Sequence, residues 1–123
     1  MAYWRRKFAA AWHGIRMGLA RERSFLVHVP VAAVVIAMGY WLRVTTTEWC
    51  LLILAITGVM AMEYMNCAVE HLAKAVTREQ NPLIGVSLDL AAAAVLVATL
   101  GAVAIGIVVF GPHLLPYLPS LQR

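Results

Sequence analysis

Residues 90–110 read LAAAAVLVATLGAVAIGIVVF, and none of these side chains carries a charge. At about 1.5 Å of rise per residue, a helix of this length is roughly 30 Å long, which matches the hydrocarbon core of a bilayer. Gly101, Gly106 and the many alanines allow a neighbouring helix to approach closely. The stretch therefore predicts a transmembrane helix that packs against other helices.

The composition of the whole chain agrees with a membrane protein. Hydrophobic residues make up 63% of the 123 residues, charged residues 13%, and the mean hydropathy is +0.80. Soluble domains typically carry about 45–50% apolar and about 25% charged residues. The net charge is +4, but the basic residues lie outside the apolar runs and not on one face of a soluble module, so no nucleic-acid partner is expected. The length allows one all-α membrane domain over residues 1–123.

Three further helices are expected before this one. The first has Trp, Phe and Leu at helical spacing opposite basic residues, which is typical of an amphipathic helix in the membrane surface; Arg16 and His13 break its apolar run, so it is not read as a signal peptide. The next two are long apolar runs bounded by interfacial aromatics. Gly111-Pro112 is expected to end the last helix, with surface coil up to Arg123. The expected elements are a surface helix over 3–20 and transmembrane spans over 25–42, 49–70 and 90–110.

The basic residues predict the orientation of the chain. Eight of the ten Lys and Arg residues lie before the first span or between the second and third spans, and only Arg43 and Arg123 lie on the other side. Cytoplasmic loops are enriched in Lys and Arg. The N-terminus and the loop between the second and third spans are therefore expected in the cytoplasm.

Polar residues follow one face of the second span. Their spacings of three, four and four residues place them on the same side of a helix: Glu63, Asn66, Glu70 and Lys74. If Trp49 marks the outer interface, the helix reaches the cytoplasmic boundary of the bilayer near Glu70, and Glu63 lies inside the bilayer. Five of the six acidic residues are expected near that depth: Glu22, Glu63, Glu70, Glu79 and Asp89.

This acidic cluster predicts phosphoryl transfer to a membrane lipid. Ionisable residues inside a membrane are costly and usually functional. Carboxylates suit Mg²⁺, which commonly bridges substrate phosphates, and a carboxylate near an alcohol can act as a general base. The four histidines do not form a ligand set, and the chain has no G-x-x-x-x-G-K-[ST] loop. The sequence therefore predicts ATP-dependent phosphorylation of a lipid alcohol at the cytoplasmic interface.

The same residues resemble a known family. The run Glu63-Tyr64-Met65-Asn66-Cys67-Ala68-Val69-Glu70 is similar to the E-x-x-N-x-A-[IV]-E signature of the small prokaryotic diacylglycerol kinase and undecaprenol kinase family. The resemblance extends over about residues 7–105 and includes Gly14-Ile15-Arg16, Glu22 with Phe25 and His28, Asn81-Pro82-Leu83-Ile84, and Asp89 with Ala93-Ala94-Val95-Leu96. His28 is more similar to the undecaprenol kinase branch.

The resemblance implies a homotrimer in the bacterial inner membrane, with active sites shared between neighbouring subunits. It implies Mg²⁺ and ATP as cofactor and co-substrate, and diacylglycerol or undecaprenol as the lipid. By residue, it places Glu22 and Glu70 on the metal and Glu63 as the general base with Asn66 as its hydrogen-bonding neighbour. It places Asp89 with Glu63 at the lipid head, and the nucleotide near Arg16, Glu22 and Glu70. Lys74, on the same face of the helix, is expected at the nucleotide as well.

The chain departs from the family pattern on the phosphate side. Family members usually have Lys before that Asp and Arg two residues earlier, where this chain has Leu88 and Val86; Lys74 stands where an Asp is usual. Lys74, or Arg78 one turn further on, could supply the missing cation.

Two alternatives to an active kinase remain open. One is a catalytically degenerate relative that binds lipid, nucleotide or a partner. The other is a small transporter with a proton site, although the acids crowd one interface and the sequence shows no internal repeat.

Overall fold

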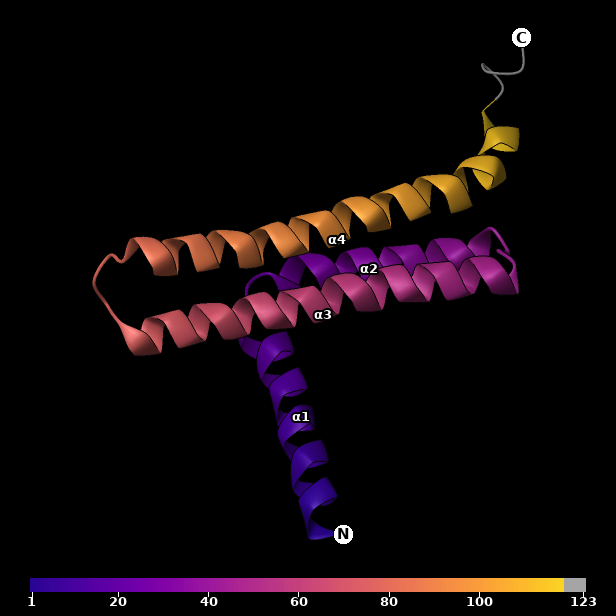
Figure 1. Ribbon diagram of the computed structural model, residues 1–123. Helices are drawn as coiled ribbons and strands as arrows, with labels where there is room; N and C mark the ends of the chain where they lie inside the picture. The colour runs from indigo at the N-terminus through magenta and orange to yellow at the C-terminus, as the bar shows by residue number, and fades with distance from the viewer. Residues whose placement is uncertain (119–123) are drawn as a thin grey trace.

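The computed structural model describes residues 1–118, and helices account for nearly all of them. The elements are α1 (Ala2–Arg21), α2 (Phe25–Trp41), α3 (Thr46–Val76), α4 (Pro82–Leu114) and a short 3₁₀ helix η1 (Leu115–Tyr117). Helices α2, α3 and α4 lie side by side, and α1 meets them only at its C-terminal end and points away from the bundle (Figure 1). The most extensive contact joins α3 to α4, which form an antiparallel hairpin.

Helices α3 and α4 are each long and apolar enough to cross a membrane. Helix α2 has 17 residues and is about 25 Å long, slightly less than a hydrocarbon core of roughly 30 Å. Helices α1 and α2 together also pass as a span, but the pair is bent by 98° at the break between them. The described residues therefore contain two candidate spans, or three if the bent pair is one span. The all-helical membrane class is confirmed, and a separate span over residues 25–42 remains a prediction.

The last helix continues past its expected end. Pro112 lies inside α4, which ends at Leu114 and leads into η1, so the predicted stop at Gly111-Pro112 and the coil over 115–117 were wrong. Pro112 cannot donate to the carbonyl oxygen of Val108, and its ring crowds that carbonyl, so packing has to offset a cost here. Val109 and Phe110 are buried in the core cluster just before it and keep the chain packed. The remainder of the expected coil, residues 119–123, lies outside the described residues.

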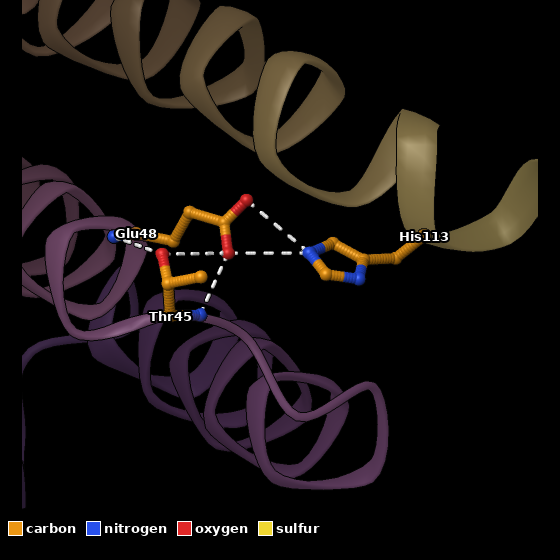
Figure 2. A network of polar contacts seen from close by, with 3 residues as sticks. All are labelled: Thr45, Glu48 and His113. Carbon is orange, nitrogen blue, oxygen red and sulfur yellow. Dashed lines mark hydrogen bonds and ion pairs between the residues drawn. The ribbon is translucent and has the colours of Figure 1, made fainter.

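The connection before α3 is also shorter than predicted, because α3 begins at Thr46. The Glu48 N–H donates to Thr45 Oγ1 at 3.3 Å, and the Thr45 N–H donates to Glu48 Oε2 at 2.7 Å, which forms a capping box. His113 Nε2 lies 3.2 Å from both carboxylate oxygens of Glu48 (Figure 2). This network ties the end of α4 to the start of α3, at the end of the bundle away from the acidic cluster.

Removal of the cap should weaken this end of the bundle. Thr45→Ala is expected to lower stability by about 1 kcal/mol, because the first turn of α3 loses its side-chain acceptor. The midpoint of unfolding in mixed detergent micelles measures the change. Thr47→Ala, in the same turn, is the control and should leave the midpoint nearly unaltered; equal losses in both variants would contradict the capping role.

Candidate active site

Helix α1 docks on the middle of α3 through a close contact. Gly18 is buried, and a Cβ atom at this position would overlap the Tyr64 ring. The Tyr64 hydroxyl donates to the Ile15 carbonyl oxygen at 2.9 Å, and its ring packs on Phe25 with centroids 4.6 Å apart. The contact brings the end of α1, and the Glu22 that follows it, to the polar face of α3.

A side chain at Gly18 should force α1 away from α3. Gly18→Val is expected to destabilise the protein by about 1–3 kcal/mol, since the added methyl groups meet an aromatic ring with no free space. Gly14→Val is the matched control, because a Cβ there meets no atom within 4 Å. Thermal unfolding in detergent compares the two; a Gly18→Val midpoint as high as that of Gly14→Val would show that the contact is loose.

Glu63 is the buried acidic residue of this region, with 3% of its surface exposed. Its Oε2 lies 3.5 Å from Nε2 of His28 on α2, and the Cys67 thiol lies 3.9 Å from its Oε1. An ionised carboxylate in an apolar setting is strongly unfavourable without a partner. His28 provides that partner across the α2–α3 contact, a pairing that the sequence analysis did not identify.

The other polar residues of α3 form a row toward its C-terminal end. Asn66 Nδ2 donates to Glu70 Oε1 at 3.0 Å, and Lys74 Nζ lies 3.9 Å from Glu70 Oε2. The helical spacing therefore brings these three together as expected. The neighbour of Asn66 is Glu70, however, and not Glu63 as the resemblance implied, because the amide group turns toward the C-terminal end of the helix.

Glu22 joins this row through a histidine that sequence reasoning missed. His71 Nε2 lies 2.8 Å from Glu22 Oε1, and His71 follows Glu70 directly in α3. Glu22, Glu63 and Glu70 all lie close enough to the Cys67 thiol for their charges to act on it. Three of the five acidic residues expected at one depth are thus gathered along about two turns of α3.

Two predicted site residues stay apart from these contacts. Arg16 and Asp89 are exposed on α1 and α4. Asp89 is seven residues beyond the start of α4 and Glu70 is six residues before the end of α3, so the hairpin places them at a similar level. Between that level and the α3–α4 turn lies a hollow of about 550 Å³, and both Lys74 and Leu88 line it.

An apolar groove of about 250 Å³ lies between α2, α3 and α4; on α3 it is lined from Leu52 to Met60, and Glu63 follows one turn further on. On α2 it is lined from His28 to Met38, about 15 Å at ~1.5 Å per residue. His28 stands at the end nearest Glu63, and Leu52 and Phe110 of the core cluster lie at the other. The site therefore combines an acidic cluster with an apolar channel that begins beside its most buried carboxylate.

This arrangement can be compared with known proteins. The model of the prokaryotic diacylglycerol kinase family matches residues 9–110. The chain belongs to this family. The chain is 32% identical to the undecaprenol kinase of Bacillus subtilis (strain 168) over 109 residues, which are 89% of each chain.

Relatives named diacylglycerol kinase match the same chain. The one of Synechocystis sp. is 33% identical over 116 residues, which are 94% of this chain and 64% of the relative. The one of Escherichia coli (strain K12) is 30% identical over 93 residues, 76% of each chain. Relatives at comparable identity to this chain are thus named for two different lipids.

Proposed function

We propose that this protein is a lipid kinase that transfers the γ-phosphoryl group of ATP to the hydroxyl of a membrane lipid, diacylglycerol or undecaprenol. The observation that carries the proposal is the buried carboxylate of Glu63 beside one end of an apolar groove. The names of the relatives support it, since they are called undecaprenol kinase and diacylglycerol kinase.

The groove and Glu63 suit a lipid alcohol. A hydrocarbon chain in the groove would meet apolar side chains and the single hydroxyl of Thr99 before it reached His28, next to Glu63. A hydroxyl at that point would lie beside a carboxylate that can take its proton as the oxygen attacks phosphorus. Asp89, at the level of Glu70 on α4, is proposed to contact the lipid head from the water side.

The nucleotide is proposed to bind on the opposite side of Glu63, along the row of Asn66, Glu70 and Lys74. Glu22 and Glu70 offer carboxylate oxygens from adjacent elements, which is the donor type that Mg²⁺ prefers. Among residues 1–118 no group of three or more His, Cys, Asp and Glu could hold a metal alone. Mg²⁺ commonly binds through one or two carboxylates plus substrate phosphates, so these two fit a shared site. When bound, the ion would neutralise charge on the phosphates.

Lys74 is proposed as the cation on the phosphate side. It lines the same hollow as Leu88, the position at which family members usually carry lysine. Arg78 does not line that hollow, so the geometry favours Lys74 over the second candidate. Arg16, at the end of α1 that carries Glu22, is proposed to face the nucleotide as well.

The proposal extends to the placement of the protein in the membrane and to its assembly. We propose that α1 lies in the cytoplasmic surface of the bacterial inner membrane, with the N-terminus and the α3–α4 turn in the cytoplasm. Large apolar side chains remain exposed along α2 and α4, including Leu26, Val34, Leu96 and Val103. Lipid and further copies of the chain would cover them, in agreement with a homotrimer that shares its sites.

Phosphate transfer in detergent micelles tests the proposal. Purified protein receives radiolabelled ATP with Mg²⁺, and diacylglycerol and undecaprenol are offered in separate reactions. We expect labelled lipid with one or both substrates and none when EDTA replaces Mg²⁺. Nucleotide binding without labelled lipid would favour a degenerate relative that binds its ligands without catalysis.

A further inference from the structure

We infer that His28 is a positioning residue that holds Glu63 as a charged carboxylate and orients it toward the groove. The inference deepens the proposed function and rests on it. It starts from the contact between two titratable side chains, 35 residues apart in the sequence, inside an otherwise apolar contact of α2 and α3.

The side chains of Glu63 and His28 differ in how much of their surface is exposed. The Glu63 side chain is 4% exposed and that of His28 is 22% exposed, with Nε2 of His28 at 3.5 Å from Oε2 of Glu63. His28 also lines the end of the groove, whereas the residues around it there are Val31, Ala32 and Met60. The imidazole is therefore placed between the apolar channel and the carboxylate.

Charge explains why this placement matters for the reaction. A general base must be ionised before it can accept the proton of the lipid hydroxyl. Burial disfavours the ionised form of a carboxylic acid, and a cation within ion-pair distance favours it. A protonated imidazole next to Glu63 would favour the carboxylate form. The carboxylate accepts the proton of the alcohol as the alcohol oxygen bonds to the γ-phosphorus of ATP, and the bond from that phosphorus to the β–γ bridging oxygen breaks and releases ADP.

The other acidic groups nearby disfavour a negative charge on Glu63. Glu22 lies before α2, and Glu70 lies on α3, two turns from Glu63; both add negative charge around Cys67. From α4, the residue that lines the groove at this level is the uncharged Thr99. Among the described residues, His28 is consequently the basic side chain within ion-pair distance of Glu63. The titratable groups around the pair are Glu22, Cys67, Glu70 and, beside Glu22, His71.

The rate of lipid phosphorylation as a function of pH tests this role. His28→Gln keeps a polar side chain of similar size but cannot carry the charge. We expect kcat to fall at and below neutral pH, and the acid limb of its pH profile to move to higher pH, because the carboxylate would have lost its cationic partner. His28→Lys, which restores a cation, should return the limb toward that of the wild type. His13→Gln, at an exposed histidine of α1, is the matched control.

Infrared spectroscopy gives a second readout that needs no activity. At neutral pH, His28→Gln should show a carboxylic-acid carbonyl band that is absent from the wild type and from His28→Gln/Glu63→Gln. The inference is overturned if no such band appears, or if an active wild type and His28→Gln share one pH profile. An inactive wild type that still shows the band on His28→Gln would count against the proposed function alone.

Discussion

Glu63→Gln is expected to lower kcat for lipid phosphorylation by about 10²–10⁴-fold, the usual contribution of a positioned general base. Glutamine has nearly the same shape as glutamate but cannot accept the proton of the lipid hydroxyl. The KM for ATP should change little, because Glu63 is packed against His28 and the groove and not against the Glu70 row. Labelled lipid formed from radiolabelled ATP measures both parameters.

The control for this prediction is the same substitution at the other end of the same helix. Glu48 contacts Thr45 and His113, far along α3 from Glu63. Glu48→Gln should leave the kinetics essentially as in the wild type, apart from any loss of stability. Comparable rates for Glu63→Gln and Glu48→Gln would remove the general base from this account.

Lys74→Ala is expected to reduce kcat by roughly 10³-fold, the lower end of the range for loss of a cation that neutralises a transferring phosphoryl group. Among the described residues, Lys74 makes an exposed ion pair with Glu70 at 3.9 Å and no other ion pair. Such surface pairs contribute about 0–1 kcal/mol to stability. A large kinetic effect with little change in the unfolding midpoint would therefore locate the role of Lys74 in the reaction.

The hollow under the α3–α4 turn offers a sharper version of this test. Lys74 and Leu88 both line it, so a lysine at either position can reach the same space. Lys74→Ala/Leu88→Lys should recover part of the activity that Lys74→Ala loses. Arg78→Ala should have little effect. Full activity in Lys74→Ala, or a large loss in Arg78→Ala, would contradict the assignment to Lys74.

Contacts within one helix could be predicted from the sequence. The spacing of Asn66, Glu70 and Lys74 brings them together once α3 forms, whatever the other helices do. The amphipathic pattern of α1 and the apolar runs of α3 and α4 likewise follow from composition and period. Helix α1 exceeds its predicted bounds by one residue at each end, whereas α3 and α4 extend three to eight residues beyond theirs. In each case the helical repeat alone determines the outcome.

Contacts between helices could not be predicted in this way. The pairs His28–Glu63 and Glu22–His71 depend on the rotation of α2 and on the 98° bend after α1, and periodicity within a single helix specifies neither. Gly18 offered a partial signal, because a glycine in a helix can mark a close approach of another element, here Tyr64. The end of α4 at Leu114 depended on burial of Phe110, which outweighed the proline signal.

The most direct test of the central claim is transfer of the labelled γ-phosphoryl group from ATP·Mg²⁺ to a lipid hydroxyl by the purified wild-type protein in micelles. The account predicts a labelled phospholipid from diacylglycerol, undecaprenol or both, formed over many turnovers. Folded protein that binds ATP·Mg²⁺ yet labels neither lipid above the level of Glu63→Gln would contradict it.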